Sequence, residues 1–407
     1  MSSPRTGLYG DPAEQTSAHP PYSPSPAPST GPSRSSAAAR KVAAVFSLAG
    51  IEINGPRPWD LQVHDERFYP RLLAGGDLAA GESYMDGWWD VEQLDEFFYR
   101  AIQVDLDRAV KVRRDWKALA FIGSQVLLNH QIKKTSHVVG EKHYDLGNDL
   151  FKAMLDKRMV YTCGYWKTAT TLDQAQENKL DLVCRKLNLK PGQKILDIGC
   201  GWGSFAKFAA EKYGVSVTGI TISEEQAKLG RELCAGLPIE ILNQDYRDIQ
   251  GEYDHIVSLG MFEHVGVKNY QTYMKVVHEH LKPGGLFLLH TIGMYKSVKV
   301  NDPWLDKYIF PNAMLPSIAQ IGRSIEDRFV MEDWHNFGAD YDKTLMAWLH
   351  NFEQAWPQLK ANYDQRFYRM WKFFLTTCAA GFRARKIQLW QIVLSKEGVP
   401  NGYQSLR

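Results

Sequence analysis

The stretch "KILDIGCGWG" (194–203) places three glycines directly behind a short apolar run. The apolar run predicts a buried strand, and the glycines predict a tight turn into a helix that ends at Gly214. Strand-like and helix-like stretches then alternate as far as residue 293. This alternation predicts an α/β fold with a doubly wound, Rossmann-like parallel sheet and helices on both faces. Ligands of such a sheet bind beyond the carboxyl ends of its strands.

The spacing of the glycines indicates which ligand binds there. It is GxGxG, whereas dinucleotide enzymes use GxGxxG, and Asp197 lies two residues before the first glycine. The second strand ends in "TIS" (221–223), without the acidic residue that nicotinamide enzymes place on a ribose. We therefore expect S-adenosylmethionine (SAM) rather than a dinucleotide, with "NQDYRD" (243–248) near its adenine.

Composition narrows the class of protein. The net charge of the 407 residues is only +2, which argues against general binding to nucleic acid. The five cysteines form no CxxC pair, which is typical of a reducing, intracellular compartment and supports no metal site. Because no run of about 18 apolar residues occurs, no transmembrane helix is predicted. We expect a cytoplasmic protein that contacts a membrane only peripherally, at the inner face of the cytoplasmic membrane.

Four segments follow from composition and pattern. They are a disordered Pro/Ser-rich tail (1–40), a small mixed α/β domain (41–110), a basic helical linker (111–135) and a catalytic domain (136–407). The small domain is rich in aromatic residues, either for packing against a second domain or as a surface for lipid. The basic stretch is interpreted either as a solvated linker helix or as a helix that meets anionic headgroups.

A series of motifs carries a family resemblance. They are "ESYMDGWWD" (82–90), "HYDLGNDLFKAMLD" (143–156), "YTCGYW" (161–166), "LDIGCGWG" (196–203), "TISEEQ" (221–226), "QDYRDI" (244–249), "GMFEHVG" (260–266), "LLHTIG" (288–293), "PWLDKYIFPNAMLPS" (303–317) and "DWHNFGADYDKTLMAW" (333–348). Together they resemble the cyclopropane fatty acid and mycolic acid synthase family, especially bacterial cyclopropane-fatty-acyl-phospholipid synthases. The resemblance runs from about residue 42 almost to the C-terminus, and it implies a class I SAM-dependent methyltransferase fold.

The resemblance also implies a reaction. Members of the family add a methylene group from SAM across a cis double bond of a phospholipid acyl chain. Methyl transfer leaves a carbocation on the chain, which needs a dry pocket, aromatic faces and a base. In the family that base is a bound bicarbonate ion. The expected partners are the phospholipid bilayer, the unsaturated phospholipid substrate and a second copy of the chain in a homodimer.

Residue by residue, the resemblance implies a bicarbonate site formed by Cys163, Glu263, His290, the backbone of Ile292, and Tyr341. His290 and the Tyr341 hydroxyl can donate to the anion, as can the Ile292 N–H. Glu263 cannot donate to it as a carboxylate, so we expect it to orient the O–H of bicarbonate. The implied SAM contacts are Tyr161, Thr162, Asp197, Gly199, Gly201, Thr221, Gln226, Gln244 and Asp245. Candidates for sheltering the cation, against plain core packing, are Tyr165, Trp166, Phe262, Tyr308 and Phe310.

Cys163 could by itself be a nucleophile, a metal ligand or a small apolar residue. The implied reaction uses no covalent thiol intermediate, and no CxxC or histidine spacing supports a metal there. We interpret Cys163 as part of the wall that holds the anion. Two other outcomes stay open for the whole chain: a methyl-branched product from the same fold, and a non-catalytic module that binds SAM or membrane. The second predicts a degraded base site, yet Glu263 and His290 are both present.

Overall fold

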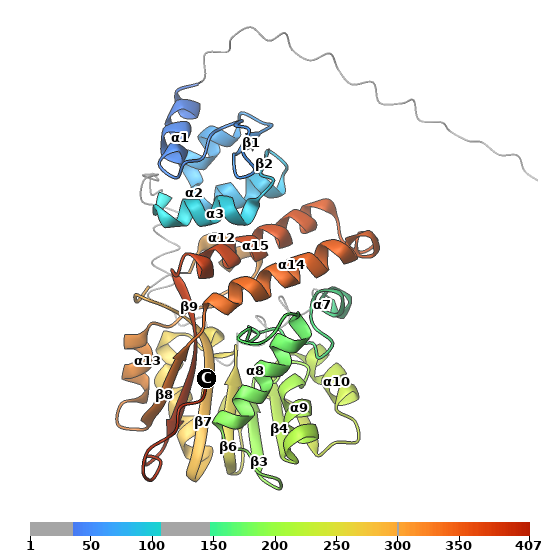
Figure 1. Cartoon of the computed structure of the whole chain (residues 1–407), viewed down its shortest axis with the longest axis vertical. Coiled ribbons are helices and arrows are strands. Elements are labelled where there is room, and N and C mark those ends of the chain that lie inside the picture. Colours follow the sequence, from blue (N-terminus) through green and yellow to red (C-terminus); the bar gives the residue numbers. More distant parts are fainter. Residues whose placement is uncertain (1–35, 107–146, 299–300) are drawn as a thin grey trace, which may run out of the picture. The chain divides into compact units, whose positions relative to one another are not determined.

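The computed structural model describes residues 36–106, 147–298 and 301–407. Its centre is a seven-stranded sheet with the strand order β5-β4-β3-β6-β7-β9-β8 (Figure 1). The strands are β3 (Lys194–Ile198), β4 (Ser216–Thr221), β5 (Ile239–Asn243), β6 (Tyr253–Leu259), β7 (Leu281–Met294), β8 (Val330–Asn336) and β9 (Ile387–Ser395). The chain order reverses direction across the sheet between β3 and β6, so β3 and its loop stand at the switch point where α/β sheets bind ligands.

Side-chain alternation along the strands divides the core between the two faces of the sheet. Ile195 of β3 packs in one apolar cluster with α8 (Leu172–Lys186) and α9 (Ser204–Tyr213). Leu196, the next residue, packs in another with α11 (Tyr270–His280) and α13 (Ile318–Ile325). Successive residues of a strand point to opposite faces, so a strand covered on both sides is apolar throughout. The predicted doubly wound arrangement is confirmed.

The sheet departs from the prediction at one edge. Strands β3 to β7 are parallel, but β9 runs antiparallel to both β7 and β8. The predicted parallel sheet covers the alternating region up to residue 293 and is confirmed for β3 to β7, whereas the antiparallel β8 and β9 were not predicted. Strands β8 and β9 follow the alternating region and are separated by two long helices, α14 (Ala339–Leu359) and α15 (Gln365–Arg383). A regular strand–helix repeat therefore does not predict them.

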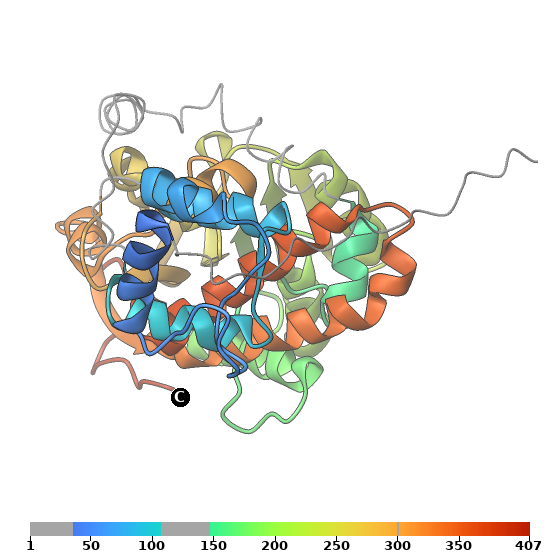
Figure 2. The same ribbon diagram turned by 90° about the horizontal axis from the view of Figure 1, so that it is seen from above.

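Residues 37–106 supply a small region of helices and short strands. Its elements are α1 (Ala37–Ser47), β1 (Gln62–Val63), α2 (Phe68–Met85), β2 (Trp89–Asp90) and α3 (Leu94–Gln103). The paired strands β1 and β2 are antiparallel, in agreement with the predicted mixed α/β character. In Figure 2, the helices coloured blue to cyan lie over the orange-to-red pair formed by α14 and α15.

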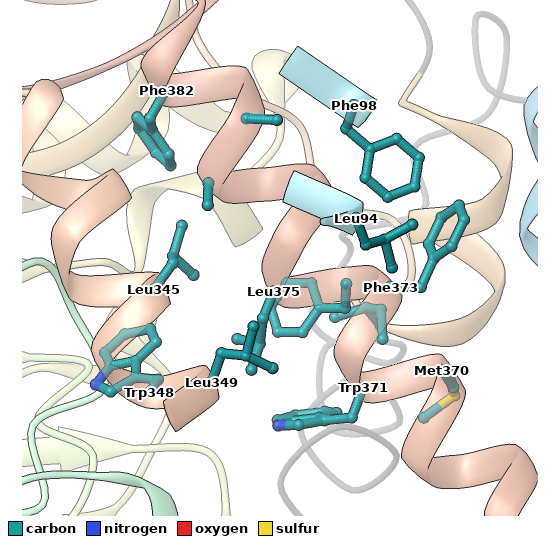
Figure 3. Close-up of a cluster of buried hydrophobic side chains, with 14 of the residues drawn as sticks. Leu94, Phe98, Leu345, Trp348, Leu349, Met370, Trp371, Phe373, Leu375 and Phe382 are labelled. Carbon is teal, nitrogen blue, oxygen red and sulfur yellow. The ribbon is translucent and has the colours of Figure 1, made fainter. Parts of the chain in front are cut away.

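The aromatic residues of this region pack mainly against the helices beneath it. Phe98 of α3 meets Phe373 of α15 edge to face, with ring centroids 4.9 Å apart (Figure 3). Arg369 of α15 donates to the carbonyl of Tyr84 and, over 2.7 Å, to that of Trp89. Trp304 of α12 (Pro303–Tyr308) is fully buried and lies against Gly81 of α2. These contacts favour the packing interpretation of the aromatic cluster.

The remaining helices are α7 (Asn148–Met154) and α10 (Glu224–Leu233), with short 3₁₀ turns η1 (Tyr246–Asp248), η2 (Phe262–His264) and η3 (Val267–Asn269). Residues 37–407 form one compact unit. The segment boundaries proposed from the sequence stay predictions, and the basic linker at 111–135 lies outside the described residues. No helix in the described part of the chain is both long and apolar enough to cross a membrane.

Candidate functional site

A pocket opens at the carboxyl ends of β3, β4 and β5. It encloses about 1320 Å³ of empty space, the mouth included. Every residue predicted to contact the cofactor lines it, namely Tyr161, Thr162, Asp197, Gly199, Gly201, Thr221, Gln226, Gln244 and Asp245. These residues come from four separate stretches of sequence, and the fold brings them together in one pocket.

The glycine-rich loop shapes the floor of the pocket. Gly199 and Gly201 have φ of 83° and 55°, in the left-handed region that favours glycine. A Cβ added at Gly201 would meet no atom within 4 Å, so that position faces open space. A ligand can therefore lie directly against the backbone there, as the cofactor of a GxGxG loop does.

Asp197, the last residue but one of β3, has a buried carboxyl group. Its Oδ2 atom has no hydrogen-bond partner among the described residues. Burial raises the pKa of Asp197 to about 7, against the lowering effect of Lys179. A buried carboxylate without a partner is costly, so the group suits a ligand that brings a cationic donor.

Two further pairs fix the wall beside β4 and β5. The Thr221 hydroxyl donates to Gln226 Oε1 over 2.9 Å, which holds the amide of α10 against the end of β4. Asp245 caps η1 by accepting from the Arg247 amide and also pairs with the Arg247 guanidinium at 2.9 Å. Arg247 is thus neutralised within the pocket wall.

The residues of the expected anion site lie beside the cofactor pocket rather than in its lining. Glu263 stands on η2, just after β6, and its Oε1 accepts the Ile292 N–H of β7 over 2.6 Å. Its second oxygen, Oε2, is buried without a partner among the described residues. Burial raises the pKa of Glu263 to about 7, although the Ile292 hydrogen bond opposes the rise.

His290 lies two residues before Ile292 on the same strand, so both side chains share one face of the sheet. Its Nδ1 atom is 3.3 Å from the amide nitrogen of Gln391 on the adjacent strand β9. With Nδ1 accepting from that amide, Nε2 carries the hydrogen, and Nε2 has no partner in the described structure. Burial lowers the pKa of His290 well below its ordinary value, which keeps the ring neutral. The ring therefore presents an N–H donor.

Cys163 and Tyr341 complete the set from other elements. Cys163 is fully buried, and its thiol donates to the Gly164 carbonyl over 3.1 Å. Burial raises the pKa of this thiol well above its ordinary value, so it is not a thiolate. Tyr341, near the start of α14, stacks on Phe382 with centroids 4.4 Å apart. Burial, with Cys163 and Glu263 nearby, raises the pKa of its hydroxyl.

Thr344, one turn beyond Tyr341 on α14, ties this helix to the segment around Cys163. Its hydroxyl oxygen accepts from the Gly164 amide over 3.1 Å and from the Trp166 indole over 2.9 Å. The same hydroxyl donates to the carbonyl of Asp340 over 2.9 Å. The sequence analysis did not predict a role for this threonine. Buried on α14, it fixes the positions of Tyr341 and Cys163 relative to each other.

None of the five aromatic candidates for the cation shelter lines the cofactor pocket. Phe262 is fully buried and stacks on Tyr270 with centroids 4.2 Å apart, an arrangement of core packing. Tyr165 meets Phe337 edge to face at 5.3 Å, and Phe337 in turn meets His290 at 5.9 Å. The ring of Phe337 thus lies between Tyr165 and His290 of the expected anion site. The shelter role of the five residues stays a prediction.

Helix α8 contributes two polar side chains that the sequence reasoning missed. Gln176 and Lys179 are fully buried, three residues apart on the face of α8 that turns to the core. Gln176 donates to the Thr162 carbonyl and Lys179 to the Thr162 hydroxyl, each over 2.8 Å. Polar residues on the apolar stripe of an amphipathic helix were the available signal.

With this geometry in view, the chain can be compared with known proteins. Residues 130–392 match the family model described as mycolic acid cyclopropane synthetase. The chain is 54% identical over 363 residues to the cyclopropane-fatty-acyl-phospholipid synthase of Escherichia coli (strain K12), covering 89% of this chain and 94% of the relative. It is 35% identical over 321 residues to the sphingolipid C9-methyltransferase A of Emericella nidulans, covering 72% of this chain and 62% of the relative.

Two solved structures of cyclopropane synthases are also similar to this chain. The cyclopropane synthase MmaA2 from Mycobacterium tuberculosis is 29% identical, with a TM-score of 0.61 over 66% of this chain and 99% of that protein. The mycolic acid cyclopropane synthase CmaA1, in complex with SAH and CTAB, is 31% identical, with a TM-score of 0.60 over 64% of this chain and 98% of that protein. Both likenesses cover well over half of the chain.

Proposed function

This chain belongs to the mycolic acid cyclopropane synthetase family, and on that premise we propose that it converts a cis double bond of a phospholipid acyl chain into a cyclopropane ring. The enzyme is a SAM-dependent methyltransferase with a class I, Rossmann-like α/β fold. The proposal extends to the base, which is a bicarbonate ion held by Cys163, Glu263, His290, Ile292 and Tyr341. It also includes peripheral contact with the inner face of the cytoplasmic membrane and a homodimeric assembly.

The cofactor pocket fits SAM in shape and charge. The glycine loop leaves its backbone open to the pocket, and Asp197 offers a buried carboxylate to the cationic end of an amino acid. SAM would supply an electrophilic methyl group to the alkene. The protein must then exclude water from the cation on the lipid chain, because water would capture it.

The observation that carries the proposed base site is a pair of buried polar atoms that have no hydrogen-bond partner within the described parts of the chain. They are Oε2 of Glu263 and Nε2 of His290. Buried polar atoms in native proteins are normally hydrogen-bonded, so each of these two calls for a ligand. A small oxyanion with its own hydroxyl group satisfies both, since it accepts from the histidine N–H and donates to the carboxylate.

Each residue then has a separate task. His290 donates to the anion through Nε2, and Glu263 accepts its O–H, which fixes the orientation of the ion. The Ile292 N–H already donates to Glu263, so it acts first by holding that carboxylate. The expectation that the same amide contacts the anion directly stays a prediction. Bicarbonate would supply the base that takes a proton from the newly added methyl group.

The experiment uses the purified full chain, SAM and vesicles of cis-unsaturated phospholipid. We expect acyl chains that are heavier by one methylene unit and have no remaining olefin. Vesicles of fully saturated phospholipid serve as the control, because they offer no alkene to the methyl donor. Products that keep an olefin, or that are saturated with a methyl branch, would contradict the assignment and favour the methyltransferase alternative that the Emericella nidulans relative represents.

A further inference from the structure

Among the described residues, the ammonium group of Lys179 is an unusual charge. The side chain has no solvent exposure, yet it lines the cofactor pocket. Its Nζ atom donates to the Thr162 hydroxyl over 2.8 Å, and it forms no ion pair with a carboxylate of the described residues. A buried charge without a counter-ion is costly, so such groups are paired in native proteins or bind a charged ligand.

The surroundings of Lys179 show which charge is missing. The titratable groups near it are Asp156, Cys163, Asp197 and the neutral ring of His290. The carboxylate of Asp156 accepts from the backbone N–H groups of Arg158 and Val160, each over 2.9 Å, and it acts on Lys179 without forming a direct ion pair with it. The Cys163 thiol is neutral. Only Asp197 keeps an oxygen without a partner, and it belongs to the same pocket.

Lys179 differs from the other cation in the described lining of the pocket. Arg247 is paired with Asp245 at 2.9 Å, so its charge is already balanced by the protein. Lys179 and Asp197 act on each other's pKa but form no direct ion pair in the described structure, so each can still take an oppositely charged partner from a ligand. This combination matches the carboxylate and ammonium of a free amino acid, which is the end of SAM opposite the adenine.

We propose that Lys179 is a cofactor-binding residue whose buried ammonium group binds the carboxylate of the methionine part of SAM. Thr162 orients Nζ toward the pocket through the 2.8 Å hydrogen bond, and Asp197 binds the ammonium of the same zwitterion. Gln176, one turn before Lys179 on α8, supports the arrangement by donating a hydrogen bond to the Thr162 carbonyl. The inference rests on the proposed function only in taking SAM as the cofactor.

The test compares two ligands by isothermal titration calorimetry with the full chain. S-adenosylhomocysteine carries the amino acid end, whereas 5′-methylthioadenosine has the same adenosine thioether without it. Lys179→Met should weaken S-adenosylhomocysteine binding by at least about tenfold, the loss of one charge-assisted contact. The affinity for methylthioadenosine should stay within about twofold. Lys186→Met is the matched control, since Lys186 is the other fully buried lysine of α8 but pairs with Asp333 at 3.5 Å. It should change neither affinity.

Equal losses for the two ligands in Lys179→Met would overturn the inference, because they would indicate general damage to the pocket. Unchanged binding of both would overturn it as well. Should Lys179→Met fail to fold, the wild-type chain still decides. Asp197, with a pKa raised by burial to about 7, is mostly ionised above pH 8, whereas burial lowers the pKa of Lys179 to about 8; above that pH, affinity for S-adenosylhomocysteine should therefore fall, and more steeply than affinity for methylthioadenosine. Parallel profiles would contradict the contact. A failure of the cyclopropane assignment would appear in the lipid product instead and leave these affinities unaffected.

Discussion

The amide of Ile292 donates a 2.6 Å hydrogen bond to Oε1 of Glu263 and leaves Oε2 of the same carboxyl group without a partner in the described structure. The contact joins the loop after β6 to the neighbouring strand β7. It fixes the carboxyl group at the strand ends, next to the strand that carries His290. The position and the unpaired oxygen together make Glu263 the residue on which the proposed base site depends most.

Glu263→Gln should therefore lower turnover by about a hundredfold or more, in the range of a lost acid–base contact. The amide of glutamine can still accept from Ile292, but its NH₂ group cannot accept the O–H of bicarbonate. Binding of S-adenosylhomocysteine should hardly change, because Glu263 lies outside the lining of the cofactor pocket. Turnover on vesicles and calorimetry on the same preparation check both halves. Equal losses in the two would mean that Glu263 acts on the cofactor pocket.

The pH dependence of turnover follows from the same carboxyl group. Burial raises its pKa from the ordinary 4.5 to about 7, so the carboxylate form becomes the major one only above that pH. Because that form would orient the proposed bicarbonate, kcat at saturating SAM should rise as the pH rises through about 7. The contribution to folding has the opposite sign: the folded state favours the protonated acid, so this stability falls between about pH 4.5 and 7 and then levels off. If the residual turnover of Glu263→Gln still rises through about pH 7, the rise is due to another titratable group.

Cys163→Ser should retain activity within about tenfold, because a serine hydroxyl can donate to the Gly164 carbonyl as the thiol does. The raised pKa of the buried thiol already argues against a nucleophilic thiolate. Turnover on vesicles checks the rate, and mass spectrometry of the intact protein checks for an adduct. Complete loss of activity, together with a covalent adduct on Cys163 of the wild-type chain, would refute this interpretation.

Gly81→Val should destabilise the chain by about 1–3 kcal/mol, the usual range for overpacking. A Cβ at this position would overlap the indole of Trp304, which is fully buried and has little room to move. Gly322→Ala in α13 is the control, since a Cβ there would meet no atom within 4 Å. Chemical denaturation measures both. A neutral Gly81→Val would show that α2 and α12 are not packed together as described.

The sequence predicted the parallel part of the sheet because apolar runs and glycine punctuation repeat regularly from β3 to β7. It did not predict the antiparallel edge. The run "IQLWQIVLS" of β9 is apolar enough for a strand, but strand direction depends on how α14 and α15 return the chain, which no local pattern records.

The sequence likewise predicted some residues of the candidate site and missed others. The cofactor residues follow directly from strand ends, where glycines and short polar motifs are visible in the sequence. Lys179 was missed because it lies in the middle of a helix that is rich in charged residues, and only packing shows that its side chain is fully buried. Gln391 was missed for a related reason: its contact with His290 depends on the register of two antiparallel strands.

The central claim is that a ring closes after the newly added methyl group loses a proton to a held base. The most direct measurement supplies SAM with a fully deuterated methyl group to the full chain and vesicles of cis-unsaturated phospholipid. The lipid products are then analysed by mass spectrometry and NMR. We expect cyclopropane chains that keep two of the three deuterium atoms, because the third leaves with the base. Chains that keep all three deuterium atoms in a methyl branch, or that retain an olefin, would contradict it.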